Sequence, residues 1–473
     1  MNKDSLRMED SAGNLVLLVS LYTFELSVLL LAIAIRRFGD KPTGFSFLTS
    51  RPGTVCIIAL PIVIVSCAVI IHQYRKSRYF GSRQFSLTVM MNLITIVLLF
   101  TVSEIAIRIF SFRAPEGLIF MDALLLPRSW DNVVARNRET LRRAFTDGSY
   151  LIYDNLLGWT VGPNRRSANG LYFSSMEAIR SPRPNIAFAN IPATFRIALV
   201  GDSFTFGLEV KYEESWGHLL EHSLGPEFQV LNFGVDGYGV DQAYLRYYRD
   251  VRPWHPNLVI FGLINQDFYR TMAVYTFVSF PEWEFPFAKP RFVVRGGQLA
   301  TLNVPLPLPD VIFSKDSIED LPFIEYDMGY NRTDWQWHYY HLSHLARFVV
   351  SRWPRWEAPT GEVSDAAMLS INSEILRSFV KLATAEGSTP VIVYFPSRRD
   401  FLPNFSPSEG ATNFAQSVFR AADIEYIDLT QCIMEINGPN RFIVGHPHYS
   451  PQTNAVVAKC LHEAILNHLP ITK

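Results

Sequence analysis

Cysteine is scarce in this sequence, whose 473 residues include only four: Cys56, Cys67, Cys432 and Cys460. Two of them lie in an apolar run and none has the spacing of a cysteine zinc site, which excludes a disulfide-scaffold protein and a Cys-based zinc protein. An excess of one charge is also missing, because 43 basic residues face 44 acidic ones and the formal net charge is -1. Nucleic-acid binders usually carry a basic surplus, so we expect no nucleic-acid partner.

Apolar sequence, in contrast, is abundant and is concentrated near the amino terminus. Hydrophobic residues make up 48% of the chain and aromatic residues 14%. Three apolar runs, Asn14 to Ile35, Thr54 to Ile71 and Leu87 to Ile109, are each long enough to cross or nearly cross a hydrocarbon core of about 30 Å. The first run is too long for a signal-peptide core and lacks a small-residue cleavage site. We therefore predict a retained membrane anchor over residues 1–112 with three transmembrane helices.

The charges beside these runs do not decide the orientation of the anchor, because the loops on its two sides carry equal numbers of Lys and Arg. An odd number of spans places the amino terminus and the large carboxyl-terminal part on opposite sides of the membrane. Glu25 and Glu104 fall inside predicted spans, where we expect each carboxylate to face the helix bundle or to reach an interface.

The composition after Arg113 becomes that of a globular domain. A lead-in segment, residues 113–190, precedes five apolar, mostly β-branched runs that are typical of buried parallel strands. These runs are Arg196 to Val200, Gln229 to Phe233, Leu258 to Ile264, Pro390 to Phe395 and Ile424 to Leu429. Amphipathic stretches alternate with them, most clearly Ala366 to Glu386. The alternation predicts a flavodoxin-like, three-layer α/β/α domain over residues 191–473, with ligands beyond the carboxyl ends of the strands.

Residues 268–364 break this rhythm. They show no alternation of strands and helices but many proline and aromatic residues, including Trp283, Phe285, Phe287, Trp335 and Trp337. We interpret the segment as an insertion over the active-site face, where its rings either fill a core of their own or form a substrate platform. His338, His341 and His344 recur in it three residues apart, but no acidic ligand is well placed beside them, so they do not predict a metal site.

Four short blocks follow the ends of predicted strands or precede the last helix. The first is Gly201-Asp202-Ser203-Phe204-Thr205-Phe206-Gly207, which places Ser203 at the carboxyl end of a strand, ahead of a helix expected to begin near Glu214. The other blocks are Asn232-Phe233-Gly234-Val235-Asp236-Gly237-Tyr238-Gly239, then Ile264-Asn265-Gln266-Asp267, and finally His446-Pro447-His448-Tyr449-Ser450-Pro451. Gly-Asp-Ser alone is a weak signal, since an ordinary helix cap looks the same. The order of all four blocks is more specific.

This ordered set resembles the SGNH (GDSL-type) hydrolase family. The resemblance implies that Ser203 is the nucleophile and His448 the base, and that an oxyanion is held by the backbone N–H of Ser203, by Gly234 and by the amide of the third block. A serine hydroxyl needs such an imidazole to take its proton, and each oxyanion donor lowers the barrier by roughly 3 to 4 kcal/mol. Leu156-Leu157-Gly158-Trp159 is similar to a bacterial subgroup anchored by amino-terminal membrane segments.

Two positions depart from the family pattern. The third block usually reads Gly-x-Asn-Asp, whereas here either Asn265 or Gln266 supplies the amide, and both can donate. The family also places an aspartate two or three residues before its histidine, where this chain has His446 and Gly445. Either a Ser-His pair works with a backbone carbonyl, or a carboxylate arrives from elsewhere in the fold, or the site is impaired.

The leading hypothesis is a membrane-anchored serine ester hydrolase that acts through an acyl-enzyme on an acylated carbohydrate or lipid. One alternative is an O-acyltransferase that modifies an exported polysaccharide, with an integral-membrane partner supplying the acyl group. Another is a catalytically weak binding or assembly module. We expect no cofactor and no metal. The resemblance to the anchored subgroup implies a multi-pass protein of the bacterial inner membrane with an extracytoplasmic catalytic domain, where Cys432 and Cys460 could pair without being required to.

Overall fold

The computed structural model describes residues 15–31, 51–80, 82–114, 117–352, 361–401 and 413–468. The chain divides into two compact units, Met1–Val133 with Asn331–Ala358 and Val134–Tyr330 with Pro359–Lys473. The predicted boundaries at residues 112 and 190 stay predictions. The expected insertion, residues 268–364, is divided between the units, because Trp335 and Trp337 belong to the first and Trp283 to the second.

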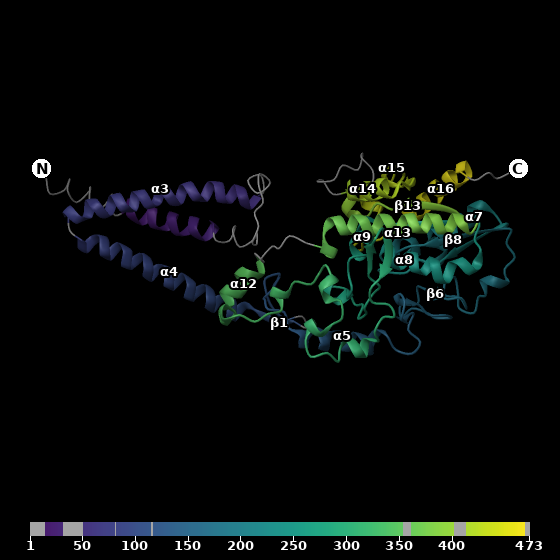
Figure 1. Cartoon of the computed structure of the whole chain (residues 1–473), viewed down its shortest axis with the longest axis horizontal. Helices are drawn as coiled ribbons and strands as arrows, with labels where there is room; N and C mark the ends of the chain where they lie inside the picture. Colours follow the sequence, from purple (N-terminus) through teal and green to yellow (C-terminus); the bar gives the residue numbers. More distant parts are fainter. Residues whose placement is uncertain are drawn as a thin grey trace. The chain divides into compact units, whose positions relative to one another are not determined.

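The first unit contains the apolar helices. A helix covers Leu15–Leu31, and α3 (Arg51–Phe80) and α4 (Ser82–Phe110) follow it (Figure 1). Among the described residues, only Ser86–Phe110 forms a helix long and apolar enough to cross a membrane, while Leu15–Leu31 and Ile58–His72 are shorter apolar helices. The prediction of three transmembrane helices is therefore supported for one span, by length and composition alone.

The carboxyl end of α4 contacts α12 (His344–Arg352) within this unit. The Glu104 carboxylate accepts hydrogen bonds from the backbone N–H groups of His344 (2.9 Å) and Leu345 (2.8 Å), and so it satisfies free donors at the start of α12. Arg108 donates to the same carboxylate at 2.6 Å. Glu104 thus joins α4 to the start of α12, and its expected position at the helix bundle or at a membrane interface stays a prediction. The three-stranded sheet of this unit is β1 (Phe112–Ala114), β2 (Gly117–Phe120) and β3 (Ala123–Leu124).

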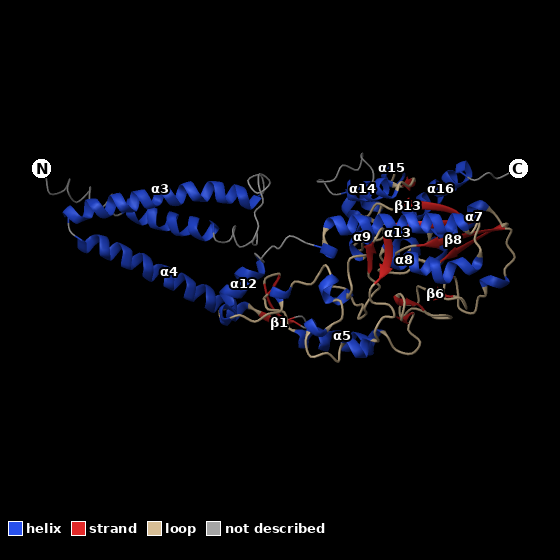
Figure 2. Ribbon diagram, viewed as in Figure 1, coloured by secondary structure: helices blue, strands red, loops and turns tan. Residues whose placement is uncertain are grey.

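A five-stranded parallel sheet, in the order β14-β13-β10-β8-β9, is the centre of the second unit (Figure 2). The strands are β8 (Phe195–Val200), β9 (Phe228–Asn232), β10 (Leu258–Leu263), β13 (Thr389–Tyr394) and β14 (Tyr426–Asp428). All five predicted strands are present, because short β-branched runs without polar alternation suit strands that are buried on both faces.

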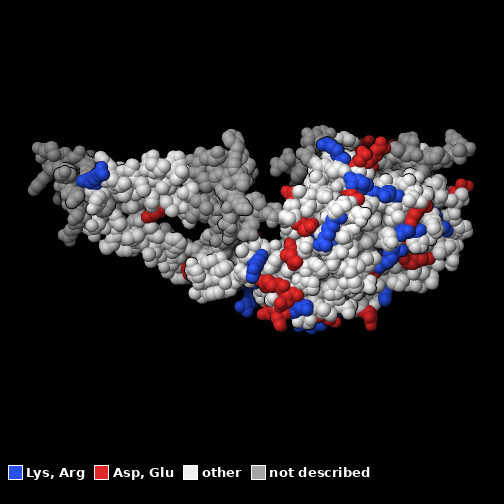
Figure 3. All heavy atoms as spheres, viewed as in Figure 1, with Lys and Arg blue, Asp and Glu red and all other residues white. Residues whose placement is uncertain are grey.

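Helices cover both faces of this sheet. One core contains Val200, Phe261 and Phe379, where α8 (Val240–Arg246), α13 (Asp365–Ala385) and α14 (Asn413–Ala422) pack. The other core contains Leu199 and Leu461, under α7 (Trp216–Leu224) and α16 (Pro451–His468). The predicted three-layer α/β/α arrangement is confirmed. On the visible surface of this unit, charges of both signs are interspersed (Figure 3).

Shorter elements surround the sheet. The segment before it forms α5 (Trp130–Ala144) and two hairpins, β4 (Leu151–Asp154) with β5 (Gly158–Val161) and β6 (Phe173–Ser174) with β7 (Arg180–Ser181). After β10 come α9 (Asn265–Arg270), α10 (Thr276–Ser279), the hairpin of β11 (Phe292–Arg295) and β12 (Gln298–Thr301), and α11 (Pro309–Ile312).

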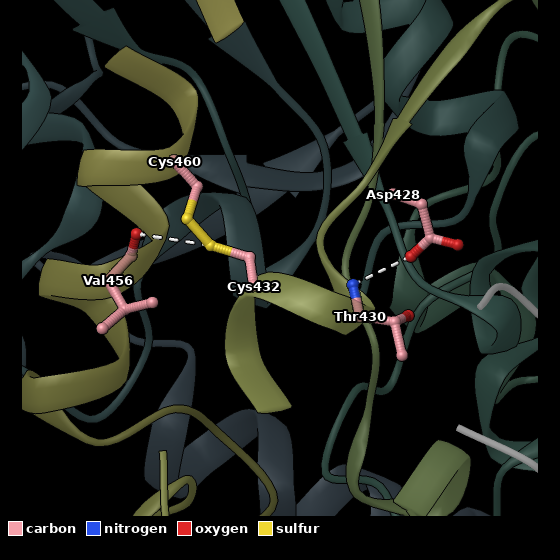
Figure 4. The surroundings of a disulfide bond; sticks show 5 residues. All are labelled: Asp428, Thr430, Cys432, Val456 and Cys460. Atoms are coloured by element: carbon pink, nitrogen blue, oxygen red, sulfur yellow. Dashed lines mark hydrogen bonds between the residues drawn. A yellow bond between two sulfur atoms is a disulfide. The ribbon is translucent and has the colours of Figure 1, made fainter. Parts of the chain in front are cut away.

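A disulfide joins Cys432 of α15 (Thr430–Met434) to Cys460 of α16 (Figure 4). The N–H of Thr430, the first residue of α15, donates to the carboxylate of Asp428, the last residue of β14, at 2.9 Å. The disulfide that the sequence allowed without requiring is thus present, and it links α15, which follows the last strand, to the final helix α16.

Candidate active site

The nucleophile candidate lies in a tight turn between β8 and α6 (Ser203–Phe206). Gly201 has φ 154, and a Cβ there would stand 2.2 Å from Thr205 Oγ1 and 2.3 Å from the Gly262 carbonyl oxygen. Only glycine fits this turn. It brings Ser203 to the carboxyl end of a central strand, where the side chain is 2% exposed.

Ser203 begins a helix of its own that the sequence analysis did not predict. The Asp202 carboxylate accepts hydrogen bonds from the N–H groups of Phe204 (2.9 Å) and Thr205 (3.3 Å), which is an N-cap. Gly207, with φ 74, ends this helix after one turn. The helix expected near Glu214 is α7, a separate element.

His448 lies against Ser203. Its Nε2 is 2.9 Å from the Ser203 Oγ, although the two residues are 245 positions apart. The Tyr449 hydroxyl, next along the chain, donates to the Pro396 carbonyl at 2.6 Å and fixes the loop before α16. The pairing that the family resemblance implies is therefore geometrically present.

The carboxylate missing from the last sequence block is replaced in space by Glu209. Its Oε2 is 3.0 Å from the His448 Nδ1, an ion-pair distance, although the contact is not aligned as a hydrogen bond. Its Oε1 is 2.7 Å from the Nδ1 of His446. Burial alone would raise the pKa of the Glu209 carboxyl, but the contacts with His448 and His446 lower it overall. The carboxylate is therefore charged at neutral pH and faces the imidazole.

Two side chains of the lead-in segment hold the loop that carries Glu209. The buried Arg180 guanidinium donates to the carbonyl groups of Phe206, Gly207 (2.5 Å) and Val210 (2.6 Å). The Glu209 N–H donates to the Tyr172 hydroxyl at 2.7 Å. Sequence reasoning missed Glu209 because it belongs to no motif, and because its φ of 70 is rare for a non-glycine residue and is set by these distant partners.

On the oxyanion side, the structure places Gly234 differently from expectation. The Gly234 N–H donates to the Asn232 Oδ1 at 3.0 Å, and a Cβ at Gly234 would stand 2.5 Å from the Phe206 nitrogen. Gly234 thus packs against α6, with its donor already occupied. Gly237, three residues later, lines the cavity that contains Ser203.

The two amide residues of the third block, Asn265 and Gln266, differ in whether they line the cavity around Ser203. Gln266 lines this cavity, and its Oε1 is buried with no hydrogen-bond partner among the described residues. Asn265, the first residue of α9, does not line it. Of the two residues that the sequence could not separate, Gln266 lines the cavity that contains Ser203.

The cavity around Ser203 has a volume of about 670 Å³. Phe280, Trp283 and Phe285 form an aromatic wall, in which the Phe280 and Trp283 rings stack at 4.4 Å and the Phe285 ring stacks on Trp159 at 4.9 Å. These rings of the insertion therefore line the cavity around Ser203, and their expected role as a substrate platform stays a prediction. Phe287, in contrast, is buried in the main core.

Arg270 lies at the base of this cavity among acidic groups. Its Nη1 is 2.7 Å from the Asp267 carboxylate and 3.5 Å from that of Asp202, and its guanidinium lies 4.8 Å from the Trp283 ring. Burial raises the pKa of the Asp202 carboxyl, and the Arg270 charge opposes this rise. Arg270 therefore links the aromatic wall to the cap of the nucleophile helix. Among the described residues, no group of three or more His, Cys, Asp or Glu could hold a metal ion.

A hydroxyl, an imidazole and a carboxylate in line at the carboxyl edge of a parallel sheet form the arrangement that serine hydrolases use. The sequence matches no family model and no curated protein. Among solved structures, it is similar to a lipase/acylhydrolase from Enterococcus faecalis, at 14% identity and a TM-score of 0.31, covering 59% of this chain and 99% of that chain. It is also similar to the acetylxylan esterase Axe2 from Geobacillus stearothermophilus, at 12% identity and a TM-score of 0.31, covering 58% and 95%. Likeness at this level carries no argument about activity.

Proposed function

We propose that this protein is a serine ester hydrolase of the SGNH type. Ser203 attacks the ester carbonyl, His448 takes the serine proton and later returns it to the leaving alcohol, and Glu209 holds the imidazole and stabilises its charged form. Water then attacks the acyl-enzyme and regenerates Ser203. The observation that supports this proposal most is the line of contacts from Ser203 Oγ through His448 to Glu209, at 2.9 and 3.0 Å.

We assign the oxyanion site to the N–H groups of Ser203 and Gly237 and to the Gln266 amide. Ser203, Gly237 and Gln266 line the cavity that contains the nucleophile, whereas Gly234 does not. The side-chain NH2 group of Gln266 can donate a hydrogen bond to an oxyanion, whereas its buried Oε1 can only accept one.

Glu209→Gln is expected to lower kcat by roughly a hundredfold to ten-thousandfold, because a neutral amide cannot stabilise the imidazolium. The measurement is hydrolysis of 4-nitrophenyl acetate by the detergent-solubilised full chain. Glu213→Gln is the matched control, since Glu213 is an exposed carboxylate on the same stretch and lines no described cavity. Equal rates for both variants would remove Glu209 from the mechanism.

The reaction class is tested by product analysis. With one acyl donor and increasing amounts of an oligosaccharide acceptor, we expect free acid to exceed acylated oligosaccharide. Water and a sugar hydroxyl compete for the same acyl-enzyme, and water is present at a far higher concentration than the acceptor. Predominant acylated sugar at low acceptor concentration would instead make the protein an O-acyltransferase, with Ser203 and His448 in the same roles.

We further propose that the first unit anchors the protein in a membrane and that the site faces the extracytoplasmic side. Many apolar side chains of α4 point outward, such as Val97 and Ile109, which are 64% and 68% exposed. The Cys432–Cys460 disulfide suits an oxidising compartment. The three-span topology, with the first run partly outside the described residues, belongs to this proposal.

An alkaline phosphatase reporter fused after Lys473 should be active in a bacterial host, because this enzyme matures only after export. A cytoplasmic reporter fused at the same position should be inactive. The reverse pattern would place the site inside the cell.

A further inference from the structure

A second cavity adjoins the candidate active site. Its volume is about 650 Å³, and it shares Leu208 and Asp236 as lining residues with the cavity around Ser203. An ester has two halves that meet at its carbonyl carbon, so a substrate larger than a short acyl ester needs space beyond the first cavity. Leu208 and Asp236 form the wall at which the two spaces meet.

The second cavity has an aromatic interior and a polar rim. Tyr172 and Phe206 lie 5.1 Å apart between ring centroids, and Tyr150 lies 5.9 Å from Tyr172. The buried Arg180 packs on the Phe206 ring at 4.5 Å and holds this cluster in place. The exposed lining residues are Arg143, Ala144, Thr146, Asp147, Gly148, Arg166 and Ala168, and the half-buried Ser149 and Ser167 add two hydroxyl groups.

This combination fits a carbohydrate better than a fatty acyl chain. A sugar ring places CH groups on its faces, which pack on aromatic rings, and hydroxyl groups at its edge, which bond to polar side chains. A hydrocarbon chain would remove water from the charged and hydroxylic rim without offering it partners. The rim carries both positive and negative side chains, so it does not require a charged ligand, and a neutral sugar can bind there.

The loop from Phe206 to Glu209 connects this cavity to the proposed chemistry. Phe206 lines the interior, Leu208 forms the shared wall, and Glu209 follows directly. Tyr172 also lines the cavity, and its hydroxyl accepts the Glu209 N–H at 2.7 Å. A ligand bound in the second cavity would therefore contact Tyr172 and Leu208, the two residues that hold the backbone of Glu209 in place.

We propose that the second cavity is a carbohydrate subsite, and that the substrate is an acylated oligosaccharide whose sugar units extend across Leu208 and Asp236. The inference rests on the proposed function and narrows its substrate from an acylated carbohydrate or lipid to an oligosaccharide. The lead-in segment, which supplies most of this lining, is then part of the substrate-binding surface.

Large side chains introduced at the rim of the second cavity test whether an oligosaccharide binds there. Ala144 and Ala168 are exposed lining residues, so tryptophan there occupies space without disturbing the core. We expect Ala144→Trp and Ala168→Trp to lower the ratio of kcat/KM for an acetylated xylo-oligosaccharide to that for 4-nitrophenyl acetate by about tenfold or more, which is about 1.4 kcal/mol of lost binding. Ala366→Trp, on the exposed side of α13 and outside both cavities, should leave the ratio unchanged. An unchanged ratio in all three variants would overturn the subsite.

A binding measurement separates this inference from the proposed function. Calorimetry on full-length Ser203→Ala should detect the oligosaccharide, and adding Ala144→Trp should weaken its binding about tenfold. If the wild type cleaved neither ester but these binding results held, the proposed function would fail and the subsite would stand. Absence of binding, or equal binding by both variants, would overturn the subsite even if 4-nitrophenyl acetate were hydrolysed.

Discussion

Ser203→Ala should reduce ester turnover by about a millionfold, because it removes the group that forms the acyl-enzyme. The Ser203 hydroxyl contacts only the His448 ring among the side-chain hydrogen bonds of the described residues, so little packing is lost. The unfolding midpoint should therefore match that of the wild type. The measurement is 4-nitrophenyl acetate hydrolysis together with thermal unfolding of the same preparation.

Two outcomes distinguish a failed mechanism from a failed fold. Wild-type turnover by a folded Ser203→Ala variant would exclude Ser203 as the nucleophile. A lowered unfolding midpoint would call for Ser203→Cys, which keeps a nucleophilic atom at the same place and should retain measurable acylation.

His448→Ala should cost a similar factor, about a millionfold, since the nucleophile then has no proton acceptor. His446→Ala is the matched control, because its ring contacts the other oxygen of the same carboxylate at 2.7 Å. Its side chain is 54% exposed, and exposed ion pairs contribute about 0 to 1 kcal/mol, so we expect a loss of no more than about fivefold.

The comparison of the two histidines also tests the alignment of the last sequence block. Both variants are measured at the same pH on the same short ester. Greater sensitivity at His446 than at His448 would mean that the motif had been aligned to the wrong histidine, and that the contact between His448 and Ser203 is structural.

The sheet was predictable because its strands are encoded locally. Each of the five β-branched runs lies within two residues of the strand that forms, and the helix expected over Ala366 to Glu386 is α13, one residue earlier. Burial on both faces imposes this composition on a parallel strand regardless of what the surrounding loops do. The membrane spans were less certain, since run length alone separates a spanning helix from a shorter apolar one.

The site was predictable only where it coincides with sequence blocks. The position of Ser203 beside His448 follows from strand order, but Glu209 reaches His448 through a loop held by Arg180 and Tyr172. No local pattern encodes that path. The same reason explains why Gly237 lines the cavity instead of Gly234, because the close approach of α6 to Gly234 is a tertiary contact.

We propose that Ser203 is a nucleophile activated by His448 and Glu209. The most direct measurement is the rate at which a fluorophosphonate probe labels the full-length protein, with the modified residue located by mass spectrometry. We expect covalent labelling of Ser203 in the wild type, a labelling rate lowered roughly a hundredfold or more in Glu209→Gln, and no labelling in Ser203→Ala. Absence of labelling in the folded wild type, or labelling of a different residue, would contradict it.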